Sequence, residues 1–177
     1  MVDAGQLVNV SLDLKVPGVG GIQGTWEPDE TEVKAAWELY VELVTRAPLG
    51  TFSLGEGSAR EAMTSMHSLF ETGRGILKVS GPSVARPKGK ERLSLGYLTV
   101  SMLNLVLRPF LTKWHPRLVV WERQGTGMGE YDWPDRREFL QSLSQVRVQL
   151  GLYASLFAEV AEVPELAGDW NVLDSSS

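Results

Sequence analysis

The last long apolar stretch of the sequence, from Asp132 to Val163, reads DWPDRREFLQSLSQVRVQLGLYASLFAEVAEV and decides the fold. Its large apolar residues recur at alternating spacings of four and three, which is typical of a helix with one continuous buried seam. The seam consists of Phe139, Leu143, Val146, Leu150, Tyr153, Phe157 and Val160. Asp132-Trp133-Pro134-Asp135 suits a helix start, and Pro164 stops further helix. The pattern therefore predicts one long final helix that packs against others.

A second apolar stretch, from Leu93 to Arg123, predicts a central helix. One side is expected to carry Leu95, Leu98, Met102, Leu105 and Val106. Pro109 and Pro116 each remove one helical hydrogen bond and crowd the carbonyl four residues earlier. They predict a kinked helix, or two helices joined near Trp114-His115. The kink is either a hinge that lets the protein change state or a fixed bend that shapes packing, and the fixed bend is the simpler interpretation.

Two more helices are predicted before these. A stripe with helical spacing predicts the first from Pro28 to Arg46. The stripe consists of Val33, Ala36, Trp37, Tyr40, Val41 and Val44. Ser58 followed by Glu61 is typical of a capping box at the start of the second, which Ser80-Gly81-Pro82 closes. The simplest assembly is a mainly α fold, an antiparallel four-helix bundle over residues 28–166 with a kinked third helix.

In the region before the bundle, residues 1–27, the stretch from Val8 to Val16 alternates apolar and polar side chains as a strand does. Its glycine-rich continuation allows a turn and a return as a hairpin. We expect this short N-terminal β strand or hairpin to act as an arm that either lies along the helices or pairs with another chain. The expected partner-binding residues of the arm are Val8, Val10, Leu12, Leu14 and Trp26. Residues 167–177 are expected to form a flexible tail.

Composition excludes several classes of protein. The 177 residues include no cysteine, so thiol nucleophiles, thiolate metal sites and disulfides are absent. Their net charge of -5 argues against nucleic-acid binding. The start has no basic and apolar segment typical of a secretory signal, which indicates a cytoplasmic protein. The longest uncharged stretch, Leu93 to Leu107, is shorter than the roughly 20 residues that span a bilayer and is interpreted as a core helix.

The usual signatures of catalysis and of metal or cofactor binding are missing. The glycines from Gly18 to Gly24 do not match the dinucleotide-binding spacing, because Gln23 stands at the third glycine position. No Glu-x-x-His pair is present for a carboxylate metal centre. Neither histidine, His67 or His115, is accompanied by a nucleophile elbow. We therefore predict no catalytic residue, no metal and no cofactor.

Four basic residues cluster between the second and third helices. They are Arg86, Lys88, Lys90 and Arg92. Such a cluster is able to contact phosphate or an anionic membrane surface, at about 1 kcal/mol per charge. A solvated loop accounts for the same residues and is the simpler interpretation.

Three phrases of the sequence resemble a family of uncharacterised, mostly actinobacterial helical proteins. They are AWELYVELVTR at 36–46, SLGYLTV at 94–100 and LRPFLTKWHP at 107–116. The likeness spans about residues 20 to 166 and includes an ending like AEVAEVP at 158–164. The resemblance implies the same order of helices and a setting in bacterial conflict or signalling systems. It implies no activity and no catalytic residue.

The leading hypothesis is a non-catalytic helical bundle that acts through protein contacts in a bacterial regulatory or defence system. Its active surface is expected to be the arm together with exposed aromatic residues, Trp26 with Trp121 or Trp133, because tryptophan is favoured at contact hot spots. One alternative, by analogy with the bundles of cell-death effectors, is a membrane-perturbing protein that uses the basic loop. Another is a bundle that binds a small ligand between its helices.

Overall fold

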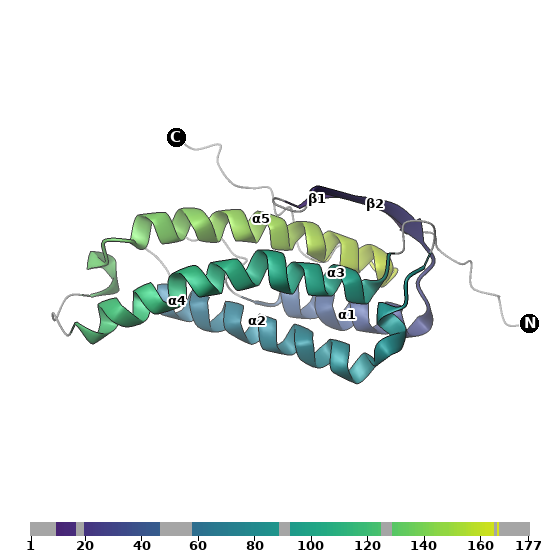
Figure 1. Ribbon diagram of the computed structural model, residues 1–177, viewed down its shortest axis with the longest axis horizontal. Coiled ribbons are helices and arrows are strands. Elements are labelled where there is room, and N and C mark those ends of the chain that lie inside the picture. The colour runs from purple at the N-terminus through teal and green to yellow at the C-terminus, as the bar shows by residue number, and fades with distance from the viewer. Residues whose placement is uncertain are drawn as a thin grey trace, which may run out of the picture.

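The computed structural model describes residues 10–16, 20–46, 58–88, 93–124, 129–164 and 166. Helices account for most of them, which confirms the predicted mainly helical class. Four helices lie side by side along the long axis, and neighbours run in opposite directions (Figure 1). They are α1 (Glu30–Val44), α2 (Ala59–Ser80), α4 (Arg108–Arg123) and α5 (Arg136–Val160). The predicted tail at 167–177 lies outside the described residues.

Helix α1 spans Glu30–Val44, slightly less than the predicted Pro28 to Arg46. Asp29 caps it, because its side chain accepts hydrogen bonds from the backbone N–H groups of Thr31 and Glu32, each at 3.0 Å. Glu32 completes a capping box by accepting from the Asp29 backbone N–H at 3.2 Å. The helix start is therefore fixed by side chains that replace missing backbone partners.

Helix α2 spans Ala59–Ser80 and is followed by a short 3₁₀ turn, η2, at Pro82–Ala85. Ser58 caps α2 by accepting from the Glu61 N–H at 3.3 Å, as the sequence predicts. Helix α3 (Leu95–Ser101) packs tightly against η2 at Gly96, where an added Cβ would lie 2.9 Å from Ala85 Cα and Cβ. Glycine is required there because the two backbones approach so closely.

The third predicted helix is continuous from Leu95 to Arg123 but contains a π-helical segment. It consists of α3 (Leu95–Ser101), the π segment η3 (Met102–Leu107) and α4 (Arg108–Arg123). Of the two predicted alternatives, two helices joined near Trp114-His115 is wrong, because both residues lie inside α4. The bonding pattern changes just before Pro109, where the Arg108 N–H bonds Leu103 O, five residues back. Proline there supplies no N–H of its own.

Helix α5 spans Arg136–Val160, shorter at both ends than the predicted Asp132 to Val163. A 3₁₀ turn, η4, occupies Glu130–Asp132 before it. At the other end Glu162 adopts a left-handed conformation with φ of 56°. The Val163 N–H then bonds Ala158 O at 3.0 Å and the Glu162 N–H bonds Glu159 O at 3.1 Å. These two bonds form a Schellman motif, which ends the helix before Pro164.

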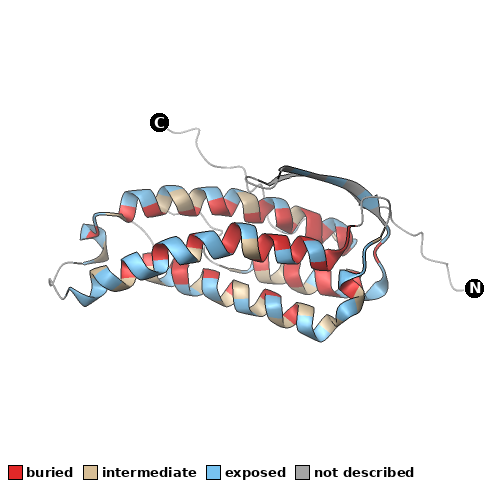
Figure 2. Ribbon diagram, in the orientation of Figure 1, coloured by how far each residue is buried: buried red, intermediate tan, exposed pale blue. Residues whose placement is uncertain are grey.

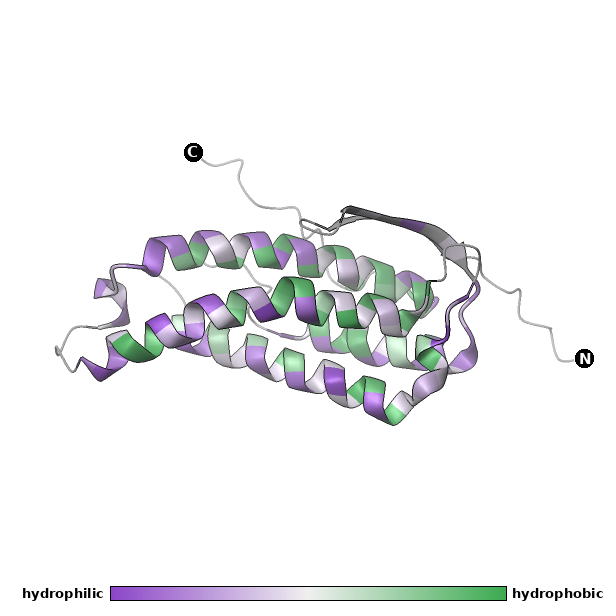
Figure 3. Ribbon diagram, in the orientation of Figure 1, coloured by the Kyte–Doolittle hydropathy of each residue, from purple (hydrophilic) through white to green (hydrophobic). Residues whose placement is uncertain are grey.

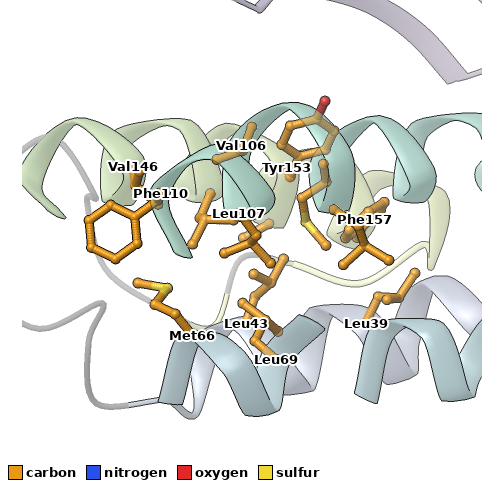
Figure 4. Close-up of a cluster of buried hydrophobic side chains, with 14 of the residues drawn as sticks. Leu39, Leu43, Met66, Leu69, Val106, Leu107, Phe110, Val146, Tyr153 and Phe157 are labelled. Atoms are coloured by element: carbon orange, nitrogen blue, oxygen red, sulfur yellow. The ribbon is translucent and has the colours of Figure 1, made fainter. Parts of the chain in front are cut away.

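The core fills the space between the helices. Figure 2 shows buried residues on the inward faces of all the helices, and Figure 4 shows side chains from α1, α2, α5 and the third helix pointing at one another. The largest fully buried side chains include Trp114, Tyr40, Tyr153, Phe139 and Phe157. Leu105 is exposed, whereas the four residues predicted to share its side of the helix, Leu95, Leu98, Met102 and Val106, are buried. The π segment accounts for this difference, because it rotates the chain about the helix axis.

The N-terminal region forms a two-stranded antiparallel hairpin of β1 (Val10–Val16) and β2 (Gly20–Trp26). Val10 pairs with Trp26, Leu12 with Gly24 and Leu14 with Ile22. The backbone of β1 lies near α5, so the hairpin lies along the helices (Figure 1). Each strand has one edge without a ladder partner in the described chain.

Candidate partner-binding groove

An aromatic cluster closes the end of the molecule where α4 ends and α5 begins. Trp114 on α4 meets Trp133 and Phe139 edge to face, with ring centroids 5.9 and 5.5 Å apart. Phe110 lies one helical turn before Trp114, with its ring 5.5 Å from that of Phe139. Edge-to-face pairs of this kind add about 1 kcal/mol each beyond apolar burial. The cluster therefore holds the segment before α5 firmly against α4.

A shallow groove of about 410 Å³ opens on the outside of this cluster. One wall is a single stripe of α4, and the other is the corner that precedes α5. The lining residues are Pro116, Arg117, Val120, Trp121, Gln124, Trp133, Pro134 and Asp135, which together we call the α4–α5 groove. Trp121 is half-buried and Val120 is 58% exposed. Figure 3 shows hydrophobic residues near this end of α4.

The charges beside the groove balance one another. Arg117 lies 3.7 Å from Asp135 and 3.6 Å from Glu138, and Lys113 donates to Glu138 at 2.6 Å. That hydrogen bond lowers the pKa of Glu138 below its ordinary value. The Lys113 ammonium and the Arg117 guanidinium also lie 4.4 and 5.2 Å from the centre of the Trp114 ring. Opposite charges thus meet across the α4–α5 interface, next to apolar walls.

Contacts to α2 hold the chain segment near the groove in place. The Glu130 carboxylate accepts from the Ser58 hydroxyl at 2.7 Å and from the backbone N–H groups of Ala59 and Arg60. Arg60 in turn pairs with Glu122 near the end of α4. A carboxylate at a helix N-terminus stabilises the unpaired N–H groups and the positive end of the dipole. The sequence indicates Ser58 as a cap, but no local pattern relates Glu130 to it.

The predicted basic cluster is divided in the structure. Arg86 is exposed, whereas Lys90 and Arg92 lie outside the described residues. Lys88 forms ion pairs with Asp29 at 2.8 Å and with fully buried Glu32 at 2.5 Å. Lys88 is therefore a structural residue, and its charge is already balanced.

This ionic cluster of Asp29, Glu32 and Lys88 joins three parts of the chain. Glu32 Oε1 also accepts from the Leu95 N–H at 3.0 Å, so α1, the loop at Lys88 and the start of α3 meet here. The hydrogen bond from Lys88 lowers the pKa of Asp29. Burial acts to lower the pKa of Lys88, but its bonds to Asp29 and Glu32 outweigh burial and raise it. Both shifts favour the charged forms.

The predicted arm residues are not brought to the groove. The hairpin lies along the C-terminal half of α5, whereas the groove is at the end where α5 begins (Figure 1). Val10, Leu12, Leu14 and Trp26 occupy ladder positions, and Val8 lies outside the described residues. Of the tryptophans predicted to be exposed, Trp133 is buried, because it packs on Trp114 and Phe139. It still lines the groove together with Trp121.

The remaining predicted features lie on the surface. Pro109 and Pro116 are exposed along the third helix, Pro109 one residue after the π segment, and a hinge there stays a prediction. His67 and His115 are both exposed. Within the described ranges, no group of three His, Cys, Asp or Glu residues is placed to hold a metal ion. One helical span, Leu95–Arg123, has the length and hydropathy to cross a membrane, but 56% of its apolar window is buried inside the protein.

Comparisons of the chain with protein-family models, with curated proteins and with solved structures find no match. The resemblance to actinobacterial helical proteins therefore stays a prediction from the three phrases quoted above. A function for this chain is therefore inferred from the residues and the geometry of the α4–α5 groove.

Proposed function

We propose that this chain is a non-catalytic protein-interaction module, an antiparallel four-helix bundle with an N-terminal hairpin arm, whose partner docks in the α4–α5 groove. The observation that carries the proposal is that exposed Val120 and half-buried Trp121 line one groove together with buried Trp133. Tryptophans at the centre of an apolar surface with a polar rim are typical of binding hot spots. The cytoplasmic setting and a role in a bacterial regulatory or defence system are proposed from the sequence. No cofactor or nucleic acid is part of the proposal.

The side chains of the groove suit the binding of a partner better than catalysis. Its walls are indole, prolyl and valyl groups, and its charged members form matched pairs. Such walls gain free energy by losing contact with water, at roughly 25 cal/mol per Å² of apolar area. A rigid floor adds to this, because the aromatic cluster is ordered before the partner arrives.

The test is a pair of matched substitutions, Val120→Lys in the groove and Val79→Lys near the end of α2. Both valines are exposed on helices, at 58% and 87%. Tagged full-length variants are isolated from cells that make the protein, and co-purified proteins are quantified by mass spectrometry. We expect a protein that Val79→Lys retains and Val120→Lys loses. The same set of co-purified proteins from both variants, with unchanged circular dichroism, would contradict the proposal.

The open hairpin edge is a second proposed contact, either with a protein partner or with another copy of the chain. Among the described residues, each strand of the sheet has one edge without a ladder partner, and such an edge is able to extend the ladder. Light scattering of the full chain and of a chain beginning at Glu27 measures this contact. A dimer that becomes a monomer supports self-association, and equal monomeric masses would exclude it. Circular dichroism must show that the shortened chain keeps its helices.

A membrane-perturbing role is the alternative, since the helix Leu95–Arg123 is long and apolar enough to span a bilayer. It requires the bundle to open, because over half of the apolar window is buried. Leakage of anionic liposomes at low salt that falls with Arg86→Glu would favour this role. Absence of leakage would remove it.

A further inference from the structure

We propose that the free edge of β2 pairs with the same edge of a second copy of this chain, so that two hairpins form one four-stranded antiparallel sheet. This inference rests on the hairpin contact of the proposed function, which it deepens by naming the occupant, and it does not depend on the α4–α5 groove. Three observations select this edge and this occupant: the position of β2, the lack of charge on it, and the residues that meet when it pairs with itself.

The position of the hairpin leaves the edge of β2 available. The hairpin lies on the outside of the bundle (Figure 1). The backbone of β1 lies near α5, whereas that of β2 lies farther from the helices, so the edge of β2 is the outer one. Gly21, Gln23 and Thr25, which share one face of β2, are exposed. An isolated pair of strands is only marginally stable in water, and additional strands stabilise it.

Charge distinguishes the two edges. When a strand pairs with its own copy in antiparallel fashion over its full length, its middle residue stands opposite itself. In β1 that residue is Asp13, and two aspartates directly opposite each other are destabilising. In β2 it is Gln23, whose amide both donates and accepts hydrogen bonds. The sequence of β2 contains no charged residue and no proline, which are the residues that protect edge strands from pairing.

The residues of β2 complement one another in this register. Gly20 stands opposite Trp26 of the second copy. Gly24 stands opposite Ile22, so both large apolar residues meet a glycine. The hairpin itself shows such a pair, Leu12 with Gly24. Large residues opposite glycines stabilise strand pairs, because glycine leaves the backbone uncovered. A second copy brings this complement with the same length of strand, which an unrelated strand would do only by coincidence.

The proposed pairing ends at two copies. In the four-stranded sheet β1 is the outer strand on both sides, and it carries Asp13 and Lys15. Charged edge strands resist further pairing. A contact between the same edge of both copies is also two-fold symmetric, so it forms a dimer and not a filament.

The test uses single cysteines, because the full-length chain contains none. In the proposed register residue 23 stands opposite itself with Cβ atoms about 5 Å apart, close enough for a disulfide after a small adjustment. Residue 25 stands opposite residue 21, so the two copies of residue 25 lie about 14 Å apart along the strands. On mild oxidation we expect Gln23→Cys to form a disulfide-linked dimer at least about tenfold faster than Thr25→Cys.

A mixture of two variants tests the register independently. An equimolar mixture of Gly21→Cys and Thr25→Cys should form linked dimers at least about tenfold faster than either variant alone. The glycine site has room for the substitution, since an added Cβ at Gly21 meets nothing within 4 Å. Circular dichroism checks that each variant keeps its helices.

Light scattering of the unmodified chain completes the test. About seven backbone hydrogen bonds over a small interface should give a dimer with a Kd on the order of 100 µM. Equal linking rates for Gln23→Cys and Thr25→Cys, or a monomer at a concentration of about 1 mM, would overturn the inference. If that happens while a cellular partner still depends on Val120, only the pairing of β2 with a second copy fails. If no partner depends on Val120 either, the groove fails as a separate finding.

Discussion

At the scale of single residues, two buried tyrosines differ in one hydrogen bond. Tyr40 accepts from the Leu166 N–H at 2.5 Å, whereas the Tyr153 hydroxyl has no hydrogen-bond partner in the part of the chain that the structure describes. Burial raises the pKa of Tyr153 to about 12. We predict that Tyr153→Phe raises the free energy of unfolding by about 1 kcal/mol, because it removes a buried group without a partner. Tyr40→Phe should lower the free energy of unfolding by a similar amount, because it removes a hydrogen bond that is made. Urea unfolding measures both variants, and a Tyr153→Phe variant less stable than Tyr40→Phe would contradict the prediction.

The end of α5 gives a second prediction at this scale. Glu162 holds a left-handed conformation that glycine adopts without strain. Glu162→Gly should therefore stabilise the protein by about 1 kcal/mol. Glu159→Gly, inside the exposed face of the same helix, should destabilise it by about 1 kcal/mol. Urea unfolding of both variants measures the difference, and a loss of stability in Glu162→Gly would show that the Schellman motif does not end the helix.

The buried carboxylate of Glu32 makes Lys88 essential for stability. Lys88→Met should lower the free energy of unfolding by about 3 kcal/mol at pH 7, because it leaves that carboxylate without its cation. Arg86→Met, at an exposed neighbour, should change it by less than about 0.5 kcal/mol. Equal losses of unfolding free energy in the two variants would contradict the structural role of Lys88.

The pH dependence of this ionic cluster follows from its pKa directions. The Asp29 pKa is lowered, so its contribution is present above its ordinary value of 3.8 and is lost as pH falls through the lowered pKa. The Lys88 pKa is raised, so its contribution is complete below 10.5 and is lost as pH rises through the raised pKa. The difference between wild type and Lys88→Met should therefore shrink at both extremes of pH. A difference that is constant from pH 2 to pH 11 would contradict it.

At the scale of elements, the π segment sets the register of the third helix. Leu98 and Trp114 are both fully buried, yet sixteen residues of regular α-helix would place them about 160° apart. The π segment absorbs one residue and reduces the angle to about 60°, within one buried stripe. The segment is therefore required by the core on both sides of it.

Deleting exposed Leu105 should convert the π segment to regular α-helix and keep both faces in the core. We predict a change in unfolding free energy below about 1.5 kcal/mol. Deleting exposed Thr112 should rotate Trp114 and Leu118 by about 100° and lower stability by more than about 4 kcal/mol. Thermal unfolding followed by circular dichroism compares the two. A Leu105 deletion as harmful as the Thr112 deletion would contradict this account of the register.

The same elements show which features sequence patterns predict. The mainly helical class, the Ser58 cap and the seam of α5 follow from local spacing, because helix periodicity is a property of neighbouring residues. The π segment does not, since an all-round apolar stretch gives no preferred register and Leu105 fits either face. The groove combines Trp121 with Trp133, which lie on different elements, and the first N–H groups of α2 bond the carboxylate of Glu130, seventy-two residues after Ser58. Only tertiary packing brings such residues together.

At the scale of the whole molecule, the residues that stabilise the fold and the residues proposed to bind a partner lie in different places. The shared core links all the helices, and the ionic cluster fixes the end near the start of α1. The groove lies at the opposite end, where Val120 is exposed (Figure 1). Because Val120 contributes little to the core, a change there should alter binding and leave the fold intact. This separation is what an interaction module requires.

The most direct measurement places a photo-reactive residue at position 120, with the matched position 79 as control, and irradiates cells that make the full-length protein. If a partner docks in the groove, position 120 gives a discrete covalent adduct that disappears when Trp121→Ala is added, and position 79 gives no such adduct. The same adducts from both positions, or none from position 120 in a protein that keeps its helical circular dichroism, would contradict the claim that the α4–α5 groove holds a partner.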